Sequence, residues 1–341
     1  MHIILGLIAA VIIFAVLVAV HEGGHFFAAK AVGVQVNEFS IGMGPLIYKR
    51  EKNGTEYSLR ALPIGGYVAL EGEDEDSDNE HAFNNRPAWA KAVVLVAGVF
   101  MNFVLAVLIL AVLITYFGTS VTPDIAKVEK GSPAYEAGIR AGSTITAVDG
   151  RSTPEGEDVR KAISKAAGDG DSTVITFIDA GGNKKEETVG FSEDENGNKI
   201  IGVQFKAGHN PLIGLKYGLI DSVKMEKEML VVLGQMVTGQ GSAGDVVGPV
   251  GIVDVVGKTA QTGFINMLYL LALLSLNLGL VNILPFPALD GGRLLFVIIR
   301  AVTGNRITDE MENRVNYAGI MVLFTLMILI TVKDVYTFIL K

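Results

Sequence analysis

Two histidines four positions apart, His21 and His25, are the residues best suited to chemistry, with Glu22 directly after the first. Residues four apart share one face of a helix, so two imidazoles spaced in this way can bind one metal ion. A glutamate beside such a pair can act as general base toward an attacking water molecule. The spacing therefore predicts a zinc-dependent hydrolytic site, provided that a third ligand lies elsewhere in the chain.

The alternative is a structural histidine pair, because a pattern with three fixed positions in five also occurs by chance. The surrounding sequence favours the metal. Residues 3–20 hold no charged residue and no proline, and about 20 apolar residues suffice to cross a hydrocarbon core at about 1.5 Å per residue. Ionisable residues in such segments are costly and mostly functional. The sequence predicts chemistry inside or at the edge of a membrane.

Asp290 is the candidate third ligand. It follows Pro285 and Pro287 at the end of another apolar run. Prolines break a helix, and the backbone groups that they free are tolerated at membrane depth only where protein or a water-filled cavity surrounds them. Asp290 offers an oxygen ligand and a negative charge, which leaves the fourth zinc position to water. The chain has no cysteine, so thiolate ligands and disulfides are excluded.

Two amides, Asn277 and Asn282, precede Asp290 in the same run. If the helix persists they lie deeper in the membrane, where their side chains can hydrogen-bond a substrate backbone. The alternative is that they join neighbouring helices.

Four uncharged runs are long enough to span a membrane, at about 3–20, 92–117, 264–289 and 315–332. Lys and Arg concentrate between the first and second runs and between the third and fourth, which predicts that both connections are cytoplasmic. The first and third runs then cross in the same direction. His21, His25 and Asp290 are therefore expected at the same depth, whereas opposite directions would place them a membrane width apart.

The composition agrees with an integral membrane protein, since 50% of the 341 residues are hydrophobic and 19% are charged. The net charge of −8 offers no basic surface, so no nucleic-acid partner is expected. We expect the first run to be retained rather than cleaved as a signal peptide, because no Lys or Arg precedes Lys30.

The segments between the runs differ from one another. Residues 34–70 combine period-two stretches with glycines, which indicates strands and tight turns. They form either a membrane-associated β element that can pair with an extended peptide or an ordinary hairpin. Residues 120–206 carry charges throughout and predict a small α+β domain. Residues 211–239 predict an amphipathic helix, on the membrane surface or packed on the bundle.

The two motifs in this order, HEGGH closing the first run and the pattern from Asn277 and Asn282 through Pro285-Phe286-Pro287-Ala288-Leu289-Asp290-Gly291, resemble the site-2 protease family of intramembrane zinc metalloproteases. Within that family the chain is similar to the bacterial regulator-of-sigma-E protease group. The insert, with Gly131-Ser132-Pro133-Ala134 and residues 142–150, resembles the PDZ domain of the family, and only one such domain fits here.

The resemblance implies one Zn²⁺ per chain, and it implies a role for six residues: His21, His25 and Asp290 as ligands, Glu22 as general base, and Asn277 and Asn282 in substrate binding. It implies hydrolysis of peptide bonds in or near transmembrane segments, in regulated intramembrane proteolysis of anti-sigma factors or signal-peptide remnants. The expected partners are single-span membrane protein substrates, the lipid bilayer and an upstream site-1 protease. The expected location is the bacterial plasma membrane, with the active site toward the cytoplasm and the PDZ-like domain outside.

The predicted fold is a polytopic α-helical membrane protein with four transmembrane helices, a membrane-associated β element and an inserted α+β PDZ-like domain. Its predicted segments are 1–25, the first transmembrane helix; 26–91, the cytoplasmic-side loop and β element; 92–118, the second helix; 119–207, the PDZ-like domain; 208–263, the amphipathic linker; 264–290, the third helix; 291–313, a cytoplasmic loop; and 314–341, the fourth helix.

Two other functions fit part of the pattern. A catalytically inactive membrane scaffold could bind partners through its PDZ-like domain, but a structural zinc site normally has four protein ligands and the sequence offers three. A metal-ion transporter would explain His and Asp residues inside a membrane. It would explain neither Glu22 beside two ligands nor the soluble insert.

Overall fold

The computed structural model describes residues 2–73, 75, 77–117, 120–194, 197–240, 247–304 and 308–338. The chain divides into two compact units, Met1–Leu110 with Leu219–Lys341, and Ala111–Gly218. Each unit has a hydrophobic core of its own. The predicted segments other than 264–290 each include residues outside the described ranges, among them the boundary at 118–119, positions 241–246 of the linker and positions 305–307 of the loop.

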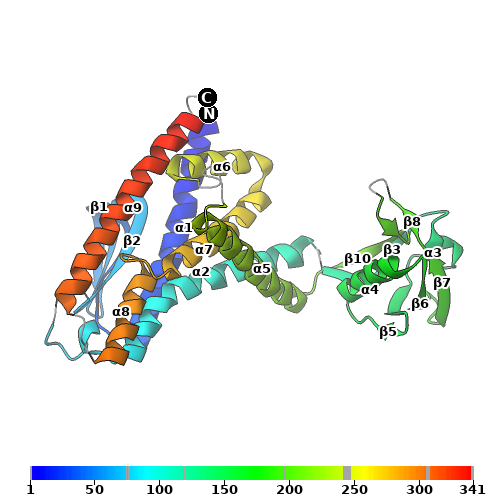
Figure 1. Cartoon of the computed structure of the whole chain (residues 1–341), viewed down its shortest axis with the longest axis horizontal. Coiled ribbons are helices and arrows are strands. Elements are labelled where there is room, and N and C mark those ends of the chain that lie inside the picture. The colour runs from blue at the N-terminus through cyan, green and yellow to red at the C-terminus, as the bar shows by residue number, and fades with distance from the viewer. Residues whose placement is uncertain are drawn as a thin grey trace. The chain divides into compact units, whose positions relative to one another are not determined.

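Within the described residues, four helices are long and apolar enough to cross a membrane: α1 (His2–Ala31), α2 (Ala88–Phe117), α7 (Phe264–Ile283) and α9 (Asp309–Phe338) (Figure 1). Each contains most of one predicted run. The helices differ most from the predicted segments at two ends. Helix α1 continues six residues beyond His25, so the histidine pair lies inside the helix. Helix α7 ends at Ile283, because the residue before a proline avoids the helical conformation.

Helix α6 (Pro249–Thr262) packs along α1. Val256 of α6 and Leu17 of α1 belong to one core cluster, and a Cβ added to Gly6 of α1 would lie 2.8 Å from the Cα of Gly257. The sequence around Gly248 suggests only a glycine-rich turn, but α6 begins there, because proline is favoured in the first turn of a helix.

The connection between α1 and α2 is a long antiparallel hairpin, β1 (Val36–Lys52) and β2 (Thr55–Leu70), followed by a short 3₁₀ helix (Phe83–Asn85). Asn53 and Gly54 both have positive φ, as a tight two-residue hairpin turn requires. Between the strands, burial raises the pKa of Glu38, but hydrogen bonds from Ser58 and Arg60 outweigh it and hold that pKa below its usual range. Both strands lie within residues 34–70, where the sequence predicts strands and tight turns.

The second unit is a twisted antiparallel sheet with one long helix. The sheet order is β10-β3-β4-β6-β7, with β5 paired to β4. Buried Phe177, Ile145 and Val159 form part of its core. Its elements are β3 (Ser120–Val128), α3 (Pro133–Glu136), β4 (Thr144–Val148), β5 (Arg151–Ser152), α4 (Gly156–Asp169), β6 (Ser172–Ile178), β7 (Lys184–Gly190), β8 (Ser192–Glu193), β9 (Lys199–Ile200) and β10 (Val203–Gly208).

Two further helices complete the chain, α5 (Pro211–Val237) and α8 (Asp290–Thr303). Helix α8 occupies positions that the sequence predicts as a loop. The run after Asp290 is apolar enough to fold as a helix, and Gly304 ends it in the left-handed conformation that favours glycine.

Candidate metal centre

Side-chain atoms of His21, His25 and Asp290 converge, each residue offering one ligand atom within 4.8 Å of the others. The Nε2 atoms of the two histidines are 3.2 Å apart, and the Oδ2 atom of Asp290 lies 3.1 Å from that of His21 and 3.4 Å from that of His25. The structure thus brings together the three residues that the sequence nominates as ligands, from α1 and from the first residue of α8.

The helical period of α1 places both imidazoles on the face that meets α2. His25 donates its Nδ1–H to the backbone oxygen of Val94 at 2.8 Å. A carbonyl oxygen only accepts, so the proton of the neutral ring is on Nδ1 and the lone pair is on Nε2, the atom directed at Asp290. Helix α2 therefore holds His25 in the tautomer whose Nε2 is free to bind a metal ion.

Asn102 of α2 contacts Nδ1 of His21, as Val94 contacts Nδ1 of His25. Its amide nitrogen lies 3.1 Å from His21 Nδ1, and the side chain is fully buried. Sequence analysis missed this residue. The available signal was a single amide within the apolar run 92–117, since a polar side chain there needs a partner.

Gly98 lies between these two positions on α2 and leaves space in front of the ligand atoms. A Cβ added to it would lie 2.4 Å from His25 Nε2 and 2.9 Å from His21 Cε1. In addition, Asp290 Oδ2 is buried and lies within 3.4 Å of both imidazole Nε2 atoms. Two imidazole nitrogens, a buried carboxylate oxygen and a space kept free of side chains fit the donor set of a catalytic zinc site.

Asp290 owes its position to an irregular segment between α7 and α8. Ala288 has a φ of +73°, a left-handed conformation that costs an alanine about 1–2 kcal/mol. Its N–H donates to the side-chain oxygen of Asn316 on α9 at 3.2 Å. Gly319 of α9 also contacts this segment, because a Cβ added there would lie 2.5 Å from the Cβ of Pro287. Helix α9 thus supports the backbone that carries Asp290.

The other predicted site residues lie at different distances from the candidate ligand atoms. Glu22 follows His21 and faces β2, where a Cβ added to Gly66 would lie 3.6 Å from Glu22 Cγ. Asn282 Nδ2 is 3.4 Å from His21 Nε2, so this amide borders the metal centre. Asn277 is exposed on α7 and contributes no atom to the ligand group.

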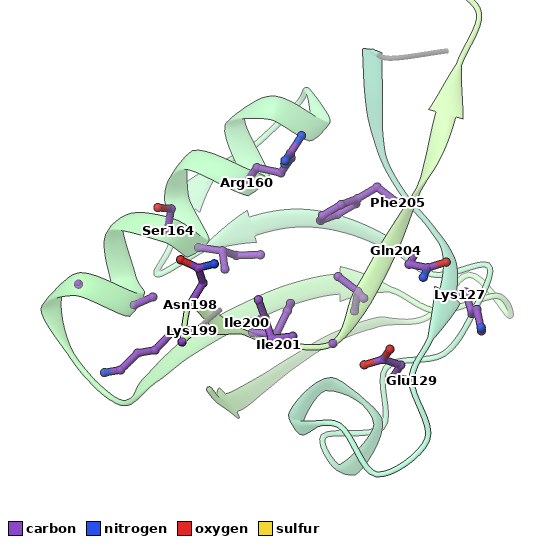
Figure 2. Close-up of a pocket in the computed structure, with 16 residues that line it drawn as sticks. Lys127, Glu129, Arg160, Ser164, Asn198, Lys199, Ile200, Ile201, Gln204 and Phe205 are labelled. Carbon is purple, nitrogen blue, oxygen red and sulfur yellow. The ribbon is translucent and has the colours of Figure 1, made fainter. Parts of the chain in front are cut away.

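The second unit holds a cavity of its own, of about 640 Å³, between α4 and the segment that leads into β10. Figure 2 shows Arg160 and Ser164 on the helical wall and Ile200, Ile201 and Phe205 on the opposite wall. Among the described strands, β10 pairs with β3 alone, and Val203, Gln204 and Phe205 of β10 line this cavity.

Known proteins resemble almost the whole chain. The model of peptidase family M50 matches residues 9–326. A relative from Clostridium acetobutylicum is 38% identical over 331 residues, which are 96% of this chain and 97% of the relative. The regulator of sigma-W protease RasP from Bacillus subtilis is 30% identical over 418 aligned positions, covering 96% of this chain and 97% of RasP.

Among solved structures, the PDZ domain of an SdrC-like protein from Listeria monocytogenes matches 25% of this chain and 86% of its own length. The two are 21% identical and the TM-score is 0.22.

Proposed function

The chain belongs to peptidase family M50, and from this premise we propose that His21, His25 and Asp290 bind the zinc ion of an intramembrane metalloprotease. The observation that carries the proposal is the convergence of their ligand atoms within 4.8 Å. When bound, zinc lowers the pKa of a water molecule to about 7 and polarises a carbonyl group. A buried carboxylate oxygen beside two imidazole nitrogens is suited to hold such a cation.

The chain is a zinc metalloprotease of regulated intramembrane proteolysis. Its family favours proteolysis over the two alternatives that the sequence left open, the inactive scaffold and the metal-ion transporter. Its long apolar helices make it a membrane protein. We infer the sidedness from the distribution of Lys and Arg, which puts the metal centre toward the cytoplasmic side and the second unit outside.

Glu22 is the general base of the proposed reaction. Its carboxylate accepts a proton from the water molecule that attacks the scissile carbonyl carbon. It then returns that proton to the amine nitrogen as the carbon–nitrogen bond breaks. Two features support this role: Glu22 directly follows a proposed ligand on α1, and Gly66 of β2, which lies beside it, presents no side chain to it.

A transmembrane substrate hides its peptide bonds in helical hydrogen bonds, so it must unwind before hydrolysis. We propose that the unwound segment pairs with an edge of the hairpin and that the Asn282 amide, at the border of the ligand group, bonds its backbone. Asn277 is proposed to bind the substrate further along α7. The name of the Bacillus relative supports membrane-bound regulators of sigma factors as substrates.

The second unit is proposed to be a PDZ-like domain that screens substrates. Its cavity offers an unpaired strand edge next to an apolar wall (Figure 2), which suits an extended peptide that adds to β10 as a strand. An upstream site-1 protease acting on the same substrate would supply such a trimmed end.

The test is cleavage of a single-span substrate by purified protein in detergent, with zinc content measured on each variant. Glu22→Gln is expected to lower cleavage by about 10²–10⁴-fold while zinc stays at the wild-type level. The matched control is Glu228→Gln, the same change at an exposed position of α5, and it should cleave normally. Substantial proteolysis by Glu22→Gln would remove Glu22 from the mechanism.

A further inference from the structure

Helix α2 faces the histidines with three residues spaced four apart, Val94, Gly98 and Asn102, which therefore share one side of the helix. Val94 accepts the Nδ1–H of His25 at 2.8 Å, and the Asn102 amide lies 3.1 Å from His21 Nδ1. Both rings therefore turn Nε2 toward Asp290 and Nδ1 toward α2.

Asn102 is held tightly in this place. The residue is 0% exposed, and its backbone oxygen accepts a hydrogen bond from the Ser275 hydroxyl at 2.8 Å. Its side-chain oxygen has no hydrogen-bond partner among the described residues. A buried amide that makes no hydrogen bond costs about 1–3 kcal/mol. The side chain of His21 lies within hydrogen-bonding distance of this amide.

The orientation of the amide decides which nitrogen of His21 carries the proton. An imidazole that binds metal through Nε2 is protonated at Nδ1 and needs an acceptor there. The oxygen and the nitrogen of an amide occupy nearly equivalent positions, and the hydrogen-bond pattern assigns them. With its oxygen toward Nδ1 the amide accepts that proton, whereas with its nitrogen toward Nδ1 it favours the ring protonated at Nε2.

We propose that Asn102 is a positioning residue whose amide oxygen accepts the Nδ1–H of His21 and so keeps Nε2 free to bind the metal. This inference rests on the proposed ligand role of His21. It assigns to α2 the same function for both histidines, through a backbone carbonyl at His25 and a side chain at His21. Only the second of these contacts can be removed by mutation.

The first experiment measures zinc affinity of the purified full chain by competition with a chelating dye. Asn102→Leu is expected to weaken zinc binding by about 10–100-fold, as losses of outer partners of a metal ligand typically do. Asn102→Asp keeps an acceptor and is expected to retain tight binding. Ser275→Ala is the matched control, because it removes a hydrogen bond to Asn102 while leaving the amide in place.

Wild-type affinity in Asn102→Leu would overturn the proposal. So would equal losses in Asn102→Leu and Ser275→Ala, since they would indicate that Asn102 acts through helix packing. His21→Ala separates the proposal from its premise. If His21→Ala binds zinc as the wild type does, His21 is not a ligand; if it loses zinc while Asn102→Leu does not, only the role of Asn102 fails.

The second experiment reads the tautomer by ¹⁵N NMR of histidine-labelled, zinc-loaded protein. The chain has five histidines, and His21→Ala identifies the signals of His21. The wild type is expected to show a protonated Nδ1 whose hydrogen exchanges slowly. In Asn102→Asp that hydrogen should move downfield, because a charged acceptor makes the stronger hydrogen bond. A His21 signal that is the same in the wild type and in Asn102→Asp would overturn the proposal, even if Asn102→Leu fails to fold.

Discussion

The two halves of the metal centre are built in opposite ways. The histidines lie in the interior of α1, a regular helix of 30 residues, and their spacing alone puts them on one face. Asp290 follows a segment with two prolines and with Ala288 in the left-handed conformation. On the helical half, regular geometry positions the ligands. On the loop half, contacts with another helix hold an otherwise unfavourable backbone in place.

The supporting helices differ in the same way. Helix α2 contacts the ligand side chains themselves, through Val94, Gly98 and Asn102. Helix α9 contacts only the backbone segment before the ligand, through Asn316 and Gly319. Changes on α2 should therefore act directly on the proposed zinc ligands, whereas the loop can move to absorb part of a change on α9.

Removing a ligand from either half should give the largest effect. His25→Ala and Asp290→Ala are each expected to lose bound zinc and to lower cleavage by about 10³-fold or more, because a metal ion contributes several kcal/mol to the transition state. The control is His209→Ala, an exposed histidine of the second unit. Normal zinc content and cleavage in either ligand variant would exclude that residue from the first coordination shell.

Alanine in place of a glycine compares the two supporting helices directly. Gly98→Ala would place a Cβ 2.4 Å from His25 Nε2, and Gly319→Ala would place one 2.5 Å from Pro287 Cβ. We expect zinc affinity to fall about 100-fold in the first and about 10-fold in the second, where the loop can yield.

Gly234→Ala on α5 is the control for both glycine variants, because no atom of the described residues outside its own stretch of helix lies within 4 Å of the added Cβ. Alanine is a better helix former than glycine, so a loss of zinc cannot come from a weaker helix. Zinc affinity in Gly98→Ala equal to that of Gly234→Ala would show that α2 does not shape the centre.

The same contrast explains what could be predicted from the sequence. His21, Glu22 and His25 were recognisable because a helical period is a local property. Asp290 was recognisable from its residue type and from the prolines before it. The four long helices and the α+β character of the insert, though not all of its strands, followed from hydropathy and alternation.

What sequence analysis missed depends on contacts between distant segments. The conformation of Ala288 follows from Asn316, 28 positions away, and no local pattern encodes it. Asn102 was overlooked because an amide in an apolar run has no visible partner until α2 meets α1. Helix α6 was taken for a turn because Gly248-Pro249 is typical of turns, although the same pair can begin a helix.

Asn316→Ala should have a moderate effect on the loop half. It leaves the Ala288 N–H without its acceptor, for a net loss of about 1 kcal/mol and about a fivefold decrease in zinc affinity. The control is Asn313→Ala, an exposed asparagine three positions earlier on α9. If both variants bind zinc as the wild type does, the loop does not need α9 to present Asp290.

Replacing alanine with glycine should have the smallest effect. The sign of the change in stability should differ between the two halves of the candidate metal centre. Ala28→Gly in α1 is expected to lower the free energy of unfolding by about 0.5–1 kcal/mol, because glycine loses more freedom in a helix. Ala288→Gly relieves about 1–2 kcal/mol of strain at a φ of +73° and loses about 0.4–1 kcal/mol to the greater freedom of the unfolded chain. It should therefore leave stability nearly unchanged or slightly higher. Unfolding titrations of both variants in the same detergent would measure this difference. If Ala288→Gly destabilises the protein as much as Ala28→Gly does, strain at Ala288 does not distinguish the loop half from the helical half.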